Sequence, residues 1–141
     1  MIRKIKKEDI DRIIEIELKT LNTTLGKENF ILALDNMMSY YYAYLIDDKI
    51  VAYISTVFDG EVIEILNICV DVEYQNKGIG FELINYVLNE LKNASRAILD
   101  VRKSNERAIH LYEKLGFKKI HVRKNYYNNS EDAIMYELKI K

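Results

Sequence analysis

The sequence predicts an α/β (α+β) fold, with a mixed, mostly antiparallel, twisted sheet of about seven strands and four helices. Two observations predict it. Apolar residues recur at helical spacing in four segments, whereas seven short segments are rich in β-branched and aromatic residues. Their order along the chain is β-α-α-β-β-β-α-β-α-β-β. Because 141 residues suit one domain with a sizeable core, we expect residues 1–141 to form a single domain.

The first half of the chain contains six of these segments. In order, they are a strand at Ile2–Ile5, a helix over Lys7–Leu21, a shorter helix over Glu28–Met38, and strands at Tyr40–Leu45, Ile50–Phe58 and Glu61–Val70. Glu8 and Asp9 favour a helix start because acidic side chains stabilise the first turn. The polar stretch Asn22–Gly26 separates the two helices, and Asp47–Asp48 and Asp59–Gly60 are typical of tight turns between strands.

The second half alternates helices with strands before a final hairpin. In order, we expect a helix from Gly78 through Leu91, a strand at Ala97–Val101, a helix carrying Ala108–Leu115, and paired strands at Phe117–Arg123 and Ala133–Ile140. Ser104 or Asn105 is suited to cap the second of these helices, and Gly116 to end it. The polar loop Asn125–Asp132 joins the last two strands.

Composition narrows the function classes. Charged residues make up 30% and the hydrophobic set 49%, which is typical of globular proteins. A net charge of −1 without a long basic run argues against nucleic acid as the main partner. One cysteine excludes a disulfide framework and a cysteine-based metal site. The polar start Met1–Asp9 lacks the apolar core of a signal peptide, so we expect a cytoplasmic protein, a monomer or weak dimer, without membrane partner or metal.

The stretch Gln75-x-x-Gly78-x-Gly80 lies between a buried strand and a helix, where free backbone N–H groups and the helix dipole favour phosphate. A nucleoside-triphosphate loop would need Lys and Ser or Thr after its glycine, but Phe81 follows Gly80. A dinucleotide loop would need a third glycine where Leu83 stands. What remains is the pyrophosphate loop pattern of acyl-coenzyme A-dependent N-acetyltransferases, or an ordinary strand-to-helix turn.

A second motif decides between them. The pattern Ser-Asn-x-x-Ala-x-x-Leu-Tyr-x-x-Leu-Gly-Phe at Ser104–Phe117, together with the Gln75–Gly80 loop, resembles the GNAT superfamily of N-acetyltransferases. The tail segments Arg123–Tyr127 and Glu131–Met135 resemble its bacterial RimI branch, which acetylates the N-terminal alanine of a small-subunit ribosomal protein. The resemblance covers the chain from Glu61 onwards and implies the GNAT fold.

The resemblance also implies how acetyl-CoA, the cosubstrate, would be held. The pantetheine arm would lie along Ile68, Cys69 and Val70, where a local splay leaves backbone groups free. The pyrophosphate would lie on main-chain N–H groups of Asn76, Lys77, Gly78, Ile79, Gly80 and Phe81. Asn105 matches the asparagine that contacts the cofactor arm, and it also suits helix capping. Tyr112 matches the tyrosine that protonates the departing thiolate, whereas periodicity alone indicates a core residue.

Two carboxylates compete for the role of general base. The RimI branch has a glutamate acting as proton acceptor at the position of Asp100, so the resemblance implies that Asp100 is the base, directly or through a water. Lysine-acetylating relatives have their general base at the position of Glu64, so Glu64 would share the role of base with Asp100 or replace it. Strand alternation puts Glu64, Leu66, Ile68 and Val70 on one face. Aspartate is one methylene shorter than glutamate, and errors of about 1 Å can cost ~100-fold in rate.

The amine acceptor is expected to enter between Asn22–Gly26 and the final hairpin loop, with Tyr126 and Tyr127 as contacts. RimI-like proteins usually carry Pro-Trp-Ser in the first loop, but this chain has neither Pro nor Trp. His110 and His121 are interpreted as ordinary helix and strand residues.

The resemblance implies an acetyl-CoA-dependent acyltransferase acting on the N-terminal amine of a protein. The leading substrate is a ribosomal protein with an N-terminal alanine. An α-amine has a pKa of about 7.7–8.0 against about 10.4 for lysine, so such an enzyme needs only a weak base. The alternatives are an enzyme for lysine or a small amine such as a polyamine or antibiotic, and a CoA-binding regulatory module without turnover.

Overall fold

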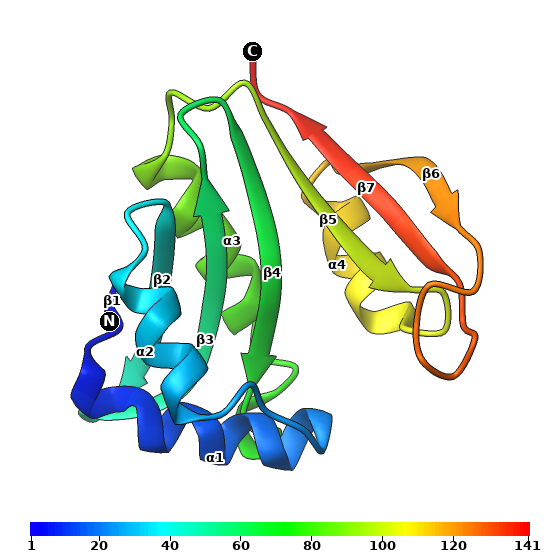
Figure 1. Cartoon of the computed structure of the whole chain (residues 1–141). Helices are drawn as coiled ribbons and strands as arrows, with labels where there is room; N and C mark the ends of the chain where they lie inside the picture. Colours follow the sequence, from blue (N-terminus) through cyan, green and yellow to red (C-terminus); the bar gives the residue numbers. More distant parts are fainter.

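The protein is described by a computed structural model covering residues 1–141, with one seven-stranded sheet in the order β1-β2-β3-β4-β5-β7-β6 (Figure 1). The strands are β1 (Ile2–Lys4), β2 (Ser39–Ile46), β3 (Lys49–Phe58), β4 (Val62–Val70), β5 (Arg96–Arg102), β6 (Lys118–Arg123) and β7 (Ala133–Lys139). The α-helices are α1 (Ile10–Leu21), α2 (Lys27–Asp35), α3 (Ile79–Glu90) and α4 (Glu106–Lys114). The sequence-based fold class and the order of elements are therefore confirmed.

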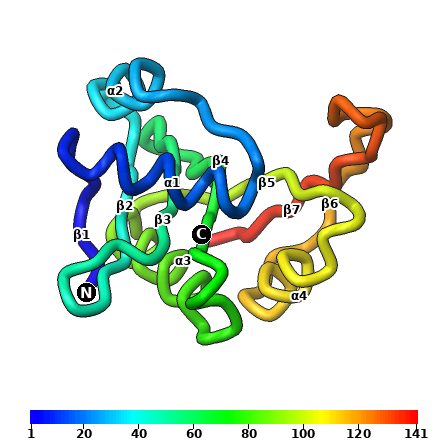
Figure 2. Tube along the Cα trace, turned by 90° about the horizontal axis from the view of Figure 1, so that it is seen from below, coloured from blue at the N-terminus to red at the C-terminus, as the bar shows by residue number.

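The helices cover opposite faces of the sheet, α1 and α2 on one and α3 and α4 on the other (Figure 2). The larger apolar cluster joins α3 and α4 to β2, β3, β4, β5 and β7, with Leu83 and Ile84 fully buried in it. The smaller cluster joins α1 and α2 to β2 and β3 through side chains such as Ile13 and Phe30. Helix α1 buries Ile10, Ile13 and Ile16 at helical spacing, whereas Leu18 and Leu21 near its end are exposed.

Strands β4 and β5 run parallel but pair only over Val62–Ile65 with Arg96–Leu99. Beyond Ile65 the two strands diverge, which opens the sheet between β4 and the β5-β7-β6 half (Figure 1). All other neighbouring strands are antiparallel. The divergence leaves the backbone edge of residues 66–70 without a strand partner on that side, as expected for a cofactor-binding strand.

A β-bulge in β4 corrects the predicted strand face. In the pairing with β3, Ser55 faces Asn67 but Thr56 faces Ile65, so Leu66 is an extra residue. The extra residue shifts the alternation by one: Ile65 and Ile68 both pack against the larger cluster. The prediction that Glu64, Leu66, Ile68 and Val70 share one face is therefore wrong, because a one-residue shift exchanges the two faces of a strand.

Two helix bounds also differ from the prediction. The first helical segment starts with a 3₁₀ turn (Lys7–Asp9), in which Asp9 accepts a hydrogen bond from the Lys6 N–H at 2.8 Å. Helix α2 ends at Asp35, because Asn36 is extended and its side chain accepts a hydrogen bond from the Met38 N–H at 2.8 Å. None of the helices is long and apolar enough to cross a membrane.

Candidate active site

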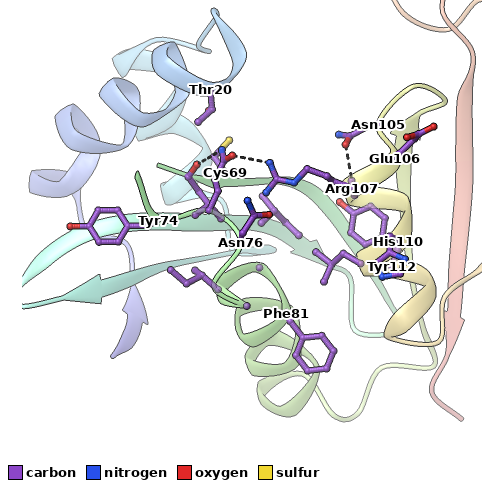
Figure 3. A pocket seen from close by; sticks show the side chains of 18 of the residues that line it. Thr20, Cys69, Tyr74, Asn76, Phe81, Asn105, Glu106, Arg107, His110 and Tyr112 are labelled. Carbon is purple, nitrogen blue, oxygen red and sulfur yellow. Dashed lines mark hydrogen bonds between the residues drawn. The ribbon is translucent and has the colours of Figure 1, made fainter. Parts of the chain in front are cut away.

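The divergence of β4 and β5 is continuous with a cavity of about 720 Å³, within the range typical of ligand sites. Its walls come from β4, the loop after it, the start of α3 and one side of α4 (Figure 3). The predicted cofactor residues that line it are Ile68, Cys69, Val70, Asn76, Gly78, Ile79, Gly80, Phe81 and Asn105. Lys77 is the exception, since it does not line the cavity and its ammonium lies 5.6 Å from the centre of the Tyr74 ring.

The loop before α3 is shaped by its own residues. Gly78 has a φ of +80°, a conformation that strains residues with a side chain, and α3 begins directly after it. The Glu82 N–H is bonded to the Gly78 carbonyl at 3.0 Å, so the N–H groups of residues 79–81 precede the first helical hydrogen bond. These donors and the helix dipole suit a pyrophosphate.

Gln75 fixes this loop to two other elements. Its amide nitrogen donates to the Val70 carbonyl at 3.0 Å, and its amide oxygen accepts from the Arg107 guanidinium of α4 at 2.8 Å. Arg107 therefore reaches across the cavity from α4 towards the phosphate loop (Figure 3). The glutamine of the loop pattern connects β4 with α4.

The cavity fits the extended, anionic shape of coenzyme A. A Cβ at Gly80 would lie 3.2 Å from Leu111 Cδ2, so the glycine permits α3 and α4 to approach each other here. Arg107 and Lys114 add positive charge to the cavity wall, close to the free N–H groups. A narrow cleft with an open strand edge, a phosphate loop and two cations matches the chemistry that acetyl-CoA requires.

Tyr112 and Asn105 lie where this cavity meets a second one, and both residues line both cavities. Tyr112 is 9% exposed, and its burial raises the pKa of the hydroxyl to about 12, with smaller contributions from Tyr127 and Cys69. The phenol therefore keeps its proton at neutral pH and is a hydrogen-bond donor. The Asn105 side chain accepts a hydrogen bond from the Ala108 N–H at 3.2 Å, which confirms the predicted helix cap.

The second cavity, of about 480 Å³, contains the predicted acceptor residues. Glu64, Asp100, Tyr126 and Tyr127 all line it, together with Thr23 of the α1–α2 loop. Segments that are far apart in sequence therefore converge beside Tyr112. The predicted route for the amine, between the α1–α2 loop and the final hairpin loop, coincides with this cavity.

The two carboxylates in the second cavity have different surroundings. Asp100 lies on β5, with its side chain 21% exposed, and Arg123 Nε of β6 donates to its Oδ1 at 3.3 Å. Glu64 is exposed and has no ion-pair or hydrogen-bond partner within the protein. One oxygen of Asp100 is therefore occupied by Arg123, whereas both oxygens of Glu64 are free to meet an incoming amine.

Hydrogen bonds and an ion pair connect the hairpin loop that carries Tyr126 and Tyr127 to the segment just before α4. Glu131 accepts a hydrogen bond from the Ser104 N–H at 2.7 Å and pairs with Arg102 at 3.3 Å, and these contacts lower the pKa of Glu131. The Arg102 guanidinium also lies 4.0 Å from the centre of the Tyr127 ring. These contacts hold Tyr127 over the second cavity.

Sequence reasoning missed several residues that line the first cavity. The omitted residues with side chains suited to binding are Tyr74, Arg107, His110 and Lys114. Arg107 and Lys114 share one face of α4 with Leu111, as their helical spacing in the sequence indicates. That spacing alone does not show whether the shared face borders a ligand or the solvent. No group of three His, Cys, Asp or Glu side chains is arranged to hold a metal ion.

Comparisons with known proteins agree with this geometry. The Acetyltransferase (GNAT) family matches residues 10–117. An N-alpha-acetyltransferase of Saccharolobus solfataricus is 34% identical over 152 residues, covering 95% of this chain and 89% of the relative. A ribosomal-protein-alanine N-acetyltransferase of Escherichia coli strain K12 is 43% identical over 81 residues, covering 54% of this chain and 55% of the relative.

A solved structure of the Escherichia coli ribosomal-protein-alanine N-acetyltransferase superimposes with a TM-score of 0.92 and 29% identity, covering 100% of this chain and 94% of that one. The fold, the two cavities and the family match lead to one conclusion. The chain belongs to the acetyltransferase (GNAT) family and is an acyltransferase that uses acetyl-CoA as its cosubstrate.

Proposed function

We propose that this protein is an N-α-acetyltransferase of the cytoplasm, and that its substrate is a small-subunit ribosomal protein with N-terminal alanine. The observation that carries the proposal is the second cavity, which brings Asp100, Glu64 and the two tyrosines of the hairpin loop beside Tyr112. The relatives named as N-alpha- and ribosomal-protein-alanine acetyltransferases support the same acceptor class.

The residues have distinct roles in the proposed reaction. Acetyl-CoA supplies the acetyl group as a thioester when it is bound. Asp100, directly or through a water, accepts the proton that the amine loses as its nitrogen forms the new C–N bond. Tyr112 donates its proton to the sulfur as the C–S bond breaks, so the products are an acetylated amine and a free thiol. Tyr126 and Tyr127 orient the acceptor, and Asn105 orients the cofactor arm.

A lysine acceptor is the second candidate, because Glu64 has no partner in the second cavity, which we call the acceptor cavity. Lysine has a pKa about 2.5 higher than an α-amine, which corresponds to roughly 3.5 kcal/mol of extra deprotonation cost. Glu64 can receive the lysine proton on either oxygen, whereas one oxygen of Asp100 already accepts a hydrogen bond from Arg123.

A peptide comparison tests the proposal. We expect thiol release with a peptide beginning with alanine, and little release with the same peptide when its N-terminus is blocked and an internal lysine is present. Mass spectrometry of the product locates the acetyl group on the α-amine. Preference for the blocked peptide would contradict the proposal and favour lysine, and an N-blocked peptide without lysine serves as the control.

A further inference from the structure

Glu17 of α1 is a buried carboxylate that the proposed mechanism does not use. It is 2% exposed and belongs to no ion pair. Its two oxygens are instead satisfied by hydroxyl groups: the Tyr53 hydroxyl donates to Oε2, and Thr24 Oγ1 donates to Oε1 at 2.6 Å. A buried carboxylate is costly unless it is hydrogen-bonded, so both contacts are needed to hold it.

The two hydroxyls belong to very different parts of the molecule. Tyr53 lies on β3, an interior strand of the sheet, is fully buried, and packs edge to face with Phe30 at a centroid distance of 6.1 Å. Thr24 lies in the loop between α1 and α2, and its Oγ1 also accepts a hydrogen bond from the Gly26 N–H at 3.2 Å. Glu17 therefore links a buried strand of the sheet to this loop.

The loop forms a wall of the site. Leu21 lines both cavities, and Thr23 lines the acceptor cavity. In the turn after α1, Asn22 adopts a φ of 58°. Outside the helices and strands, no hydrogen bond between main-chain groups involves residues 22–25. The contact between Thr24 and Glu17 is the side-chain bond that ties the middle of this wall to the sheet.

We infer that Glu17 is a positioning residue for the acceptor: through Thr24 it holds the α1–α2 loop in the place that shapes the acceptor cavity. The inference rests on the proposed function only in that an amine acceptor occupies this cavity. Losing the Thr24 hydroxyl removes the hydrogen bond that holds the loop to Glu17, so the loop loosens while Tyr53 keeps Glu17 in place. The effect is therefore expected on acceptor binding rather than on the chemical step.

Thr24→Val tests the link because it removes the hydroxyl and keeps the shape. We expect the KM of the acceptor to rise by about tenfold, while kcat and the KM of acetyl-CoA stay within about twofold. Amide hydrogen exchange across residues 22–26 should become faster. Thr24→Ser, which keeps the hydroxyl, should restore acceptor KM and slow exchange.

Glu17→Gln provides a second variant and Glu15→Gln its matched control. Glu15 lies on the same helix, but its side chain is 58% exposed and faces Arg12 at the surface. We expect Glu17→Gln to raise the acceptor KM and Glu15→Gln to leave it unchanged. The inference is overturned if exchange accelerates without a change in acceptor KM, or if both KM values rise by the same factor.

The test separates this inference from the proposed function. If the wild-type protein acetylates lysine peptides and not N-termini, the proposed function fails. The acceptor KM is then measured with the lysine peptide, and the Thr24 and Glu17 variants decide on the positioning role in the same way.

Discussion

Tyr112 belongs at once to the apolar core and to the junction of the two cavities. The same burial accounts for both properties, because an apolar environment disfavours phenolate and keeps the hydroxyl protonated. Asp100 is the opposite case: its carboxylate is at the rim of the acceptor cavity and is held by Arg123. At the scale of single residues, the two groups proposed as acid and base therefore differ in burial and in their partners.

Replacing Tyr112 with Phe is expected to lower kcat by about 100-fold, because the departing thiolate loses its proton donor. The KM of acetyl-CoA should change little, since the ring still fills the junction. With a pKa of about 12, Tyr112 should cause no decline of kcat up to about pH 10 in the wild-type protein. Steady-state thiol release across pH measures both effects, and an unchanged kcat would remove Tyr112 from the mechanism.

Asp100→Asn is expected to lower kcat/KM by about 100-fold, the lower end of the contribution typical of a general base, and Glu64→Gln to lower it less. Both substitutions keep the shape of the side chain while removing its charge. Thiol release with an alanine-starting peptide measures the two values. The opposite result, with Asp100→Asn unaffected and Glu64→Gln impaired at least tenfold, would assign the base to Glu64.

Individual elements determine the shape of the cofactor site. Helix α3 presents free N–H groups because it begins at Ile79, directly after a glycine in the left-handed region. Helix α4 can lie close to it because Gly80 has no side chain to meet Leu111. Strand β4 contributes through its bulge at Leu66 and through its open edge after Ile65.

Gly78→Ala is expected to cost about 1 kcal/mol of unfolding free energy, because alanine is strained at a φ of +80° even though no atom lies within 4 Å of the added Cβ. Relaxation of the strained loop should also raise the KM of acetyl-CoA by about fivefold. Gly60→Ala is the matched control: Gly60 has a φ of +97° and equal space, but it lies in the β3–β4 turn.

Gly60→Ala should therefore cost similar stability and leave the KM of acetyl-CoA unchanged. Urea unfolding and steady-state kinetics on the two variants make the comparison. An equal rise in KM for both variants would show that the effect is global and not a property of the phosphate loop.

At the scale of the whole molecule, a buried ion pair connects the two layers of the site. Arg12 of α1 donates to the Ile50 carbonyl at 2.9 Å and to Asp71 Oδ2 at 2.7 Å, directly after β4. Asp71 is 1% exposed, and its other oxygen has no hydrogen-bond partner, although Lys19 lies 3.9 Å away. The pair fixes the helix that precedes the acceptor loop to the end of the strand that faces the cofactor.

Arg12→Met is expected to lower the unfolding free energy by about 3 kcal/mol at pH 7, because it leaves the Asp71 carboxylate buried without its main partner. Burial acts to raise the pKa of Asp71, but the Arg12 hydrogen bond and the Lys19 charge outweigh it, so the pKa lies below its usual value. Stability from a lowered carboxyl pKa is present above the unfolded pKa of about 3.9 and is lost as the pH falls further.

The difference between wild type and Arg12→Met should therefore shrink as the pH falls below about 4, as measured by urea unfolding across pH. Glu15→Gln, which removes only the exposed partner of Arg12, should cost less than about 1 kcal/mol. A difference that stays constant between pH 7 and pH 3 would show that the Asp71 charge is not the source of the stabilisation.

The order of elements, the glycine turn before α3 and the Asn105 cap could be predicted from the sequence, because each depends on residues that are close along the chain. It also placed Tyr126 and Tyr127 on a loop that borders the acceptor cavity.

Other features depend on contacts between segments that are distant in the sequence. The Leu66 bulge, which reverses the facing of Glu64, depends on how β4 pairs with β3. The pairing of Asp100 with Arg123 and the burial of Glu17 between Tyr53 and Thr24 join residues far apart in sequence. Local patterns report backbone preference and periodicity, whereas the partner of a charged side chain depends on which strands and helices are packed together.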